Sequence, residues 1–223
     1  MQILLFDIDG TLLNTGGAGQ AAMELALKTV FNVTNRTEGV PAAGRTDRAI
    51  VTDLFAYHKI EETPELWMTF QETYFQHLTE VFPTLPGQTL IGIELLLATL
   101  HEREDVVLGL LTGNFRQGAQ LKLGHYRLDH YFAFGGFGDN HHDRDDVARS
   151  AMLAVTEHQQ VDVDPSSVWV IGDTPADVRC GRAIGARTVA VATGSFTHDD
   201  LIETKPDHLF SDLGDTQAFL DLL

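Results

Sequence analysis

The stretch Ile3-Leu4-Leu5-Phe6-Asp7-Ile8-Asp9-Gly10-Thr11 decides the fold. Its first four residues are apolar without alternation, which is typical of a parallel strand covered by helices on both faces. Two carboxylates follow at the point where such a strand ends. Because ligands bind beyond the carboxyl ends of strands in an open parallel sheet, Asp7 and Asp9 are predicted to lie at a functional site.

Further apolar runs predict the other strands of the same sheet. They are Val106–Leu111, Val168–Ile171 and Thr188–Val191, with weaker candidates at Tyr131–Phe134 and His208–Phe210. Helical patterns lie between the runs, at Leu90–His101, Arg116–Leu123, Asp145–Glu157, Ala176–Ala183 and Asp215–Leu222. Strands that alternate with helices favour a Rossmann-like, doubly wound α/β sheet with right-handed crossovers.

Residues 16–84 interrupt this alternation, because they contain helical patterns and no convincing strand. The patterns are Ala18–Val30, Asp47–Tyr57 and Pro64–Val81. Gly16-Gly17 and Pro86-Gly87 punctuate the entry and the exit, where turns are expected. The sequence therefore predicts an α-helical insertion, residues 16–84, in an α/β core formed by residues 1–15 and 85–223.

Polar residues also follow the other predicted strands. Thr112, Gly113 and Asn114 come after one run, and Asp173 and Asp177 come after another. Carboxylates crowded at one sheet edge raise one another's pKa values, so they need a cation. Mg²⁺ suits a site with few carboxylates, several waters and a substrate phosphate. An aspartate can attack phosphorus, and a second carboxylate can protonate the leaving alcohol.

These motifs resemble the haloacid dehalogenase superfamily of hydrolases over nearly the whole chain. The matching segments are Asp7–Leu12, Leu110–Asn114 and Val170–Asp177, in this order and each behind or within an apolar run. The resemblance implies a fold with a helical cap inserted in the α/β core. It also implies a phosphoryl-transfer site that binds Mg²⁺.

The resemblance implies a role for each motif residue. Asp7 would be the nucleophile and a metal ligand, and Asp9 the general acid and base that also binds the metal through its backbone carbonyl. Asp173 would bind Mg²⁺ directly, with Asp177 supporting it from a second layer. Thr112 would hydrogen-bond the phosphoryl group. The neighbouring residues expected to contact the substrate are Gly10, Thr11, Gly113 and Asn114.

The motif that usually supplies a lysine departs from the superfamily pattern, because residues 134–144 contain no lysine. Arg144 is the candidate for the missing cation, and a subgroup similar to phosphoglycolate phosphatases has such an Asp-Arg pair. Arg149 is an outside alternative. A guanidinium can clamp a phosphate, but its planar fork differs from an ammonium.

The helical insertion supplies one further candidate. Arg45 precedes a predicted helix and is expected to face the distal part of the substrate, while Asp47 is expected to cap that helix. The aromatic residues at helical spacing are expected to pack inside the insertion rather than to stack on a ligand. They are Trp67, Phe70, Tyr74 and Phe75.

The composition limits the kinds of molecule that the protein is expected to bind. The net charge of −17 disfavours nucleic acids and anionic membranes, so the expected partner is a small phosphorylated metabolite. A single cysteine, Cys180, excludes an intramolecular disulfide, and the first residues lack a signal-peptide pattern. We therefore expect a cytoplasmic protein, either a monomer or a homodimer.

The leading interpretation is a Mg²⁺-dependent phosphatase that acts on a small phosphomonoester through an aspartyl-phosphate, similar to phosphoglycolate phosphatases. A phosphosugar mutase resembling β-phosphoglucomutase is the main alternative, because it would use the same residues. A slow phospho-acceptor module is disfavoured by Asp9, which would hasten dephosphorylation. A dehalogenase is disfavoured too, since relatives of that type lack an acid at this position.

Overall fold

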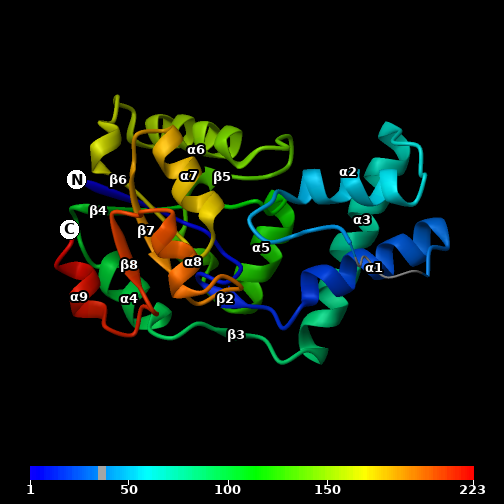
Figure 1. The fold of residues 1–223 in the computed structure, drawn as a ribbon, viewed down its shortest axis with the longest axis horizontal. Helices are drawn as coiled ribbons and strands as arrows, with labels where there is room; N and C mark the ends of the chain where they lie inside the picture. The colour runs from blue at the N-terminus through cyan, green and yellow to red at the C-terminus, as the bar shows by residue number, and fades with distance from the viewer. Residues whose placement is uncertain (35–38) are drawn as a thin grey trace.

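The computed structural model describes residues 1–34 and 39–223. Its main sheet has six parallel strands in the order β5-β4-β1-β6-β7-β8 (Figure 1). Their bounds are β1 Gln2–Phe6, β4 Val106–Leu111, β5 Gly135–Gly136, β6 Val168–Gly172, β7 Arg187–Val191 and β8 His208–Phe210. The central position of β1, between β4 and β6, confirms the predicted doubly wound α/β class.

Helices cover both faces of this sheet. They are α4 Ile93–His101, α5 Arg116–His125, α6 Arg144–Gln159, α7 Pro175–Ala183, α8 His198–Glu203 and α9 Thr216–Leu220. The alternation of side chains along β1 divides the core, because Leu4 and Phe6 pack with α4, α5 and α9. Ile3 and Leu5 pack with α6 and α7 on the opposite face.

Three helices form a separate bundle beyond the end of the sheet: α1 Ala18–Phe31, α2 Asp47–Tyr57 and α3 Pro64–Val81 (Figure 1). They share a hydrophobic cluster that includes Phe55, Phe70 and Tyr74. The cluster also takes in Phe115 from the loop after β4, so the bundle packs directly on the sheet end. The boundaries of this bundle as a cap domain, residues 16–84, stay a prediction.

Both connections to the helical bundle run through a small second sheet. Its antiparallel strands are β2, Leu13–Asn14, and β3, Gln88–Thr89, with Leu13 opposite Thr89. The remaining short elements are the 3₁₀ helices η1 Phe82–Thr84, η2 Asp129–Tyr131 and η3 Pro165–Ser167. None of the helices in the described part of the chain combines the length and the apolarity needed to span a lipid bilayer.

Several predicted elements need correction. The strand expected at Tyr131–Phe134 is wrong: η2 ends at Tyr131, and the strand is β5 at Gly135–Gly136. Glycine is needed there because a Cβ on Gly136 would lie 2.5 Å from the backbone oxygen of Val147. Helix α4 begins later than expected, after Gly92, which has a left-handed φ of 83°. Helix α8 was not predicted.

Candidate active site

The ends of β1, β4 and β6 open into one cavity of about 710 Å³ beneath the helical bundle. Asp7 and Asp9 come from β1, and Gly113 and Asn114 follow β4. Asp173 and Thr174 follow β6. Parallel strands with a shared carboxyl edge thus bring together residues that lie more than 160 positions apart in the sequence.

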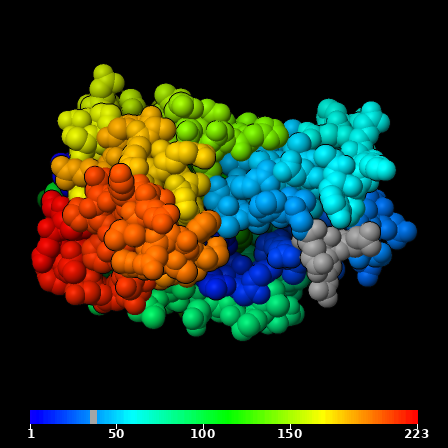
Figure 2. Space-filling model, in the orientation of Figure 1, coloured from blue at the N-terminus to red at the C-terminus, as the bar shows by residue number. Residues whose placement is uncertain are grey.

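The helical bundle closes over this edge through α2 and the loop before it. The backbone N–H of Asp47 donates to the oxygen of Gly113 at 2.7 Å, and the N–H of Phe115 donates to Asp47 Oδ2 at 2.8 Å. A Cβ on Gly113 would lie 2.1 Å from the oxygen of Arg45, so only glycine permits this approach. In Figure 2 the same segment, in light blue, lies against the gold residues after β6, and a Cβ built on Gly44 would lie 3.1 Å from Ala176 Cβ.

The expected cap residue of α2 is wrong by one position. Thr46 is the N-cap, because its φ of −87° and ψ of 148° are extended and its hydroxyl accepts from the N–H of Ala49. Asp47 is the first helical residue, and its carboxylate instead accepts a hydrogen bond from the backbone N–H of Phe115 in the loop after β4.

Three carboxylates form a tight group: one oxygen from each of Asp7, Asp173 and Asp177 lies within 4.8 Å of the others. All three residues are buried. Burial raises the pKa of Asp173, and the neighbouring charges of Asp177 and Asp7 raise it further. Burial likewise raises the pKa of Asp7, although the Arg144 guanidinium opposes the shift. Burial and mutual repulsion therefore disfavour the ionised forms of Asp7 and Asp173 in this group.

The chemistry of the donor set fits a hard metal ion. Asp177 already accepts from Thr174 with Oδ2 and from Arg144 with Oδ1, so its oxygens are largely used within the protein. Asp173 accepts only a 3.3 Å bond from the Thr11 hydroxyl among the hydrogen bonds of the described residues. Asp7 and Asp173 are thus the ligands that would bind a metal directly, with Asp177 behind them.

Two glycines leave room for Asp173. A Cβ on Gly10, whose φ is 83°, would lie 2.4 Å from Asp173 Oδ2, and a Cβ on Gly194 would lie 1.7 Å from the same atom. Thr193 also donates its hydroxyl to the oxygen of Gly10 at 2.6 Å. The backbone at Gly10 is therefore held close to the carboxylate of Asp173.

Arg144 lies inside the carboxylate group and is only 3 % exposed. Its guanidinium pairs with Asp177, and Nη2 lies 3.5 Å from Asp7 Oδ1. Burial alone would lower the pKa of this guanidinium, but the surrounding carboxylates raise it above its ordinary value. Arg149, the outside alternative, lies on the exposed face of α6 and pairs with Asp146, so it does not reach the cavity.

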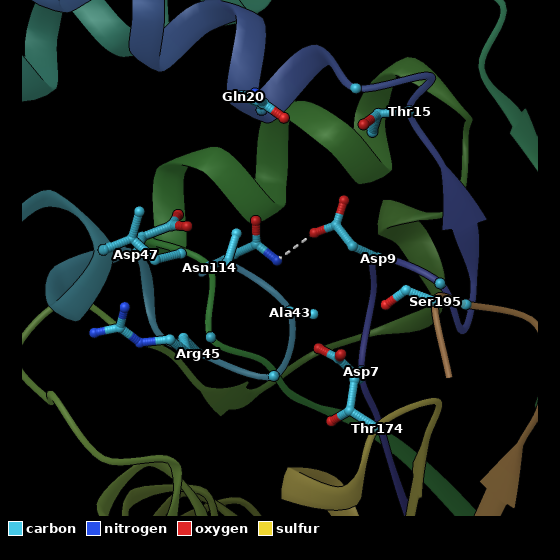
Figure 3. A pocket seen from close by; sticks show the side chains of 18 of the residues that line it. Asp7, Asp9, Thr15, Gln20, Ala43, Arg45, Asp47, Asn114, Thr174 and Ser195 are labelled. Carbon is cyan, nitrogen blue, oxygen red and sulfur yellow. Dashed lines mark hydrogen bonds between the residues drawn. The ribbon is translucent and has the colours of Figure 1, made fainter. Parts of the chain in front are cut away.

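Asp9 has different surroundings from Asp7. Its side chain is 41 % exposed, whereas that of Asp7 is 8 % exposed. Asp9 Oδ2 accepts from Asn114 Nδ2 at 2.8 Å (Figure 3). It also accepts from Lys122 Nζ at 2.6 Å. The two carboxylates after β1 therefore differ, one enclosed with Arg144 and the other presented to the cavity.

Lys122 was missed by the sequence reasoning. It stands on α5 and is 4 % exposed, and its Nζ also donates to Asn114 Oδ1 at 2.5 Å. Burial alone would lower the pKa of Lys122, but the carboxylates of Asp9 and Asp47 raise it. One signal was available, because Ala119 and Leu123 place Lys122 on the apolar face of its helix.

Two other residues that were expected to contact the substrate, Thr112 and Arg45, form hydrogen bonds with neighbouring protein groups. Thr112 is fully buried, and its Oγ1 accepts from Asn114 Nδ2 at 2.8 Å. The guanidinium of Arg45 donates to the oxygen of Pro41 and to Asp53 Oδ2, at 3.0 and 2.7 Å. It points away from Asp7 in Figure 3, although the residue lines the cavity.

The sequence of the chain matches a known protein family. The family model of haloacid dehalogenase-like hydrolases matches residues 4–191. The pyrophosphatase PpaX of Bacillus cereus is 24 % identical over 221 residues, which cover 97 % of this chain and 95 % of that protein.

Solved structures with the same fold include a predicted phosphoglycolate phosphatase from Haemophilus somnus, with a TM-score of 0.71 and 19 % identity, covering 99 % of this chain and 98 % of that one. CbbY from Rhodobacter sphaeroides, solved in complex with phosphate, has a TM-score of 0.76 and 16 % identity, with 96 % of both chains covered. Because the family model spans most of the sequence and the motif residues meet at one cavity, the chain belongs to the family of haloacid dehalogenase-like hydrolases.

Proposed function

We propose that this hydrolase is a Mg²⁺-dependent phosphatase that acts on a small phosphomonoester through an aspartyl-phosphate on Asp7. One observation carries the proposal: the enclosed carboxylate of Asp7 and the exposed carboxylate of Asp9 leave the same strand toward one cavity. The names of the similar proteins, a pyrophosphatase and a phosphoglycolate phosphatase, and the phosphate bound to CbbY support phosphoryl chemistry.

Asp7 and Asp173 would hold the metal, with the Asp9 backbone carbonyl as a further ligand and Asp177 behind them. When bound, Mg²⁺ supplies positive charge to the phosphoryl oxygens and to the crowded carboxylates. Arg144 adds a fixed cation beside Asp7. Gly10, Gly113 and Asn114 line the cavity, and their oriented N–H groups would stabilise the negative charge of a phosphoryl group there.

In the first step, a carboxylate oxygen of Asp7 attacks phosphorus, and the bond from phosphorus to the ester oxygen breaks. Asp9 gives its proton to the departing oxygen, so the alcohol leaves neutral. In the second step, Asp9 takes a proton from water as the water oxygen attacks phosphorus. Inorganic phosphate leaves, and Asp7 and Asp9 return to their starting states. Lys122 and Asn114 hold Asp9 in place for both proton transfers.

A screen of phosphorylated metabolites with Mg²⁺ tests the function. We expect inorganic phosphate in a one-to-one ratio with the substrate consumed, and loss of turnover in EDTA. An isomeric phosphate ester in place of free phosphate would instead identify a mutase. Turnover that persists in EDTA would contradict the metal-dependent mechanism.

Replacing Asp9 with Asn is expected to reduce turnover of alkyl phosphates by about 10² to 10⁴, because the leaving alkoxide then receives no proton. With p-nitrophenyl phosphate, whose leaving group needs no proton, the first step should survive and the second should stall. Rapid mixing should therefore show a burst of about one p-nitrophenolate per enzyme.

Asp199→Asn, which changes a fully exposed carboxylate on α8, is the matched control and should leave both steps unchanged. Equal losses for alkyl and p-nitrophenyl phosphate, without a burst, would remove Asp9 from the proton transfer.

Mg²⁺ is expected to stabilise the protein more as the pH rises. The raised pKa values of Asp7 and Asp173 mean that the folded, metal-free protein holds protons that the unfolded chain has already released. These carboxyls therefore cost stability as the pH rises above the ordinary carboxyl range of about 4. A divalent cation replaces the protons, so its binding strengthens over the same interval.

Thermal unfolding with Mg²⁺ and with EDTA measures this effect. The shift in Tm should be small at about pH 5 and largest at about pH 8, and saturating metal should contribute about 2–3 kcal/mol at a hundredfold excess over Kd. Asp173→Asn should remove most of the shift. A Mg²⁺ effect that is independent of pH, or that survives this substitution, would contradict the assignment of the ligands.

A further inference from the structure

The cap side of the cavity contains a polar group that the proposed chemistry does not use. Tyr74 is fully buried on α3 and lines the cavity, and its hydroxyl has no hydrogen-bond partner among the described residues. A buried hydroxyl without a partner costs free energy, so it calls for a ligand or a water. The same residue was expected from the sequence to serve only in packing.

Other polar groups face the same part of the cavity. A Cβ built on Gly19 of α1 would lie 3.7 Å from Lys122 Nζ and 3.9 Å from Tyr74 Oη, so both polar ends converge on this glycine. Asp47 lines the same cavity and uses Oδ2 for one backbone bond, while a carboxylate can accept about four hydrogen bonds. Figure 3 shows Asp47 beside Asn114, on the side away from Asp9.

The protonation states suit hydroxyl groups. Burial and the charges of Asp47 and Asp9 raise the pKa of Tyr74 well above its ordinary value, so it remains a neutral donor. Burial also raises the pKa of Asp47, to about 6, which leaves this group mainly an acceptor at neutral pH. A donor and an acceptor at one place match a ligand hydroxyl, which both accepts and donates.

The charges disfavour an anion at this end of the cavity. Among the described residues that line it, three carry positive charge, and each has an acidic partner. Lys122 pairs with Asp9, Arg144 with Asp177, and Arg45 with Asp53. A carboxylate or second phosphate placed near Asp47 would therefore meet a like charge without a spare cation.

We propose that Tyr74, Asp47 and Gly19 form a subsite that binds the hydroxyl groups of an uncharged, polyhydroxylated leaving group, as in a polyol or sugar phosphate. Tyr74 donates to a substrate hydroxyl, Asp47 accepts from one, and Gly19 leaves the space for it. This inference rests on the proposed phosphatase function. It distinguishes the substrate of this chain from phosphoglycolate and pyrophosphate, whose leaving groups are anionic.

Three six-carbon phosphates test the subsite in the presence of Mg²⁺. Sorbitol 6-phosphate has an uncharged hydroxylated chain, 6-phosphogluconate adds a carboxylate at the far end, and hexyl phosphate lacks the hydroxyls. We expect kcat/KM for sorbitol 6-phosphate to exceed that for 6-phosphogluconate at least about tenfold. In Tyr74→Phe, kcat/KM should fall about three- to tenfold more for sorbitol 6-phosphate than for hexyl phosphate.

A second variant in the subsite and a control variant outside it complete the test. Gly19→Ala adds a methyl group at ordinary contact distance from Tyr74 Oη and suits the helix, so it should reduce the same selectivity without unfolding the protein. Tyr57→Phe removes a hydroxyl from an exposed tyrosine on α2 and should leave kcat/KM unchanged for both sorbitol 6-phosphate and hexyl phosphate.

The possible failures are distinguishable. If the enzyme hydrolyses none of these phosphates nor p-nitrophenyl phosphate, the phosphatase function itself is wrong. If the enzyme hydrolyses them but prefers 6-phosphogluconate, the subsite is overturned while the phosphatase function stands. The same conclusion follows if Tyr74→Phe and Gly19→Ala lower kcat/KM equally for all three substrates.

Discussion

Replacing Asp7 with Asn is expected to lower kcat for every phosphomonoester by about 10⁴ or more, the scale on which removal of a nucleophile acts. Asn is nearly the same size but cannot form an acyl phosphate under these conditions. Phosphate release with p-nitrophenyl phosphate and Mg²⁺ measures the loss. No burst should appear, which separates this variant from Asp9→Asn.

The same substitution should not weaken the fold. The pKa of Asp7 is raised by burial and by the charges of Asp177 and Asp9, so the ionised side chain costs stability when no metal is bound. A neutral Asn removes that cost, and Tm in EDTA at about pH 8 should therefore stay level or rise. Turnover within about tenfold of the wild type would show that Asp7 is not the nucleophile.

Replacing Arg144 with Met is expected to destabilise the protein by about 3–5 kcal/mol in the absence of metal. The guanidinium is 3 % exposed and lies among Asp7, Asp173 and Asp177, so its removal leaves buried carboxylates without a compensating charge. Urea unfolding in EDTA measures the change. Activity should fall as well, because the cation beside the nucleophile is lost.

Arg149→Met is the matched control on the same helix. Arg149 is 59 % exposed and pairs only with Asp146 among the described residues, so the change should stay within about 0.5 kcal/mol. Arg144→Lys, which keeps the charge but not the fork, should lose less stability than Arg144→Met. Similar small effects at positions 144 and 149 would contradict a central role for Arg144.

The sequence was sufficient for most strands of the sheet and for the expectation that Asp7, Asp9 and Asp173 lie at one edge of it. Long apolar runs such as Val106–Leu111 identify buried parallel strands, and the geometry of a parallel sheet then brings the residues that follow them together. Where the pattern was weak, the prediction failed. Strand β5 consists of two glycines, which carry no apolar signal and are needed because α6 and β4 approach so closely.

The surroundings of Asp9 could not be predicted in the same way. Lys122 lies 113 positions from Asp9, and a lysine on a helix ordinarily extends into solvent. Its burial depends on how α5 packs beneath the helical bundle, which is a tertiary property. Tyr74 is a similar case. Helical spacing predicted that its ring is packed inside the bundle, but it gave no information about the hydrogen bonding of its hydroxyl.

The short antiparallel pair β2–β3 has a consequence for chain connectivity. Leu13 faces Thr89 and Asn14 faces Gln88, so the two ends of the helical bundle are hydrogen-bonded neighbours. For the α/β core, the whole insertion thus occupies the place of a hairpin loop. Since the entropy of closing a loop grows only slowly with its length, lengthening these helices at the ends far from the sheet should cost the core little, provided that the contacts of Asp47 and Phe115 are kept.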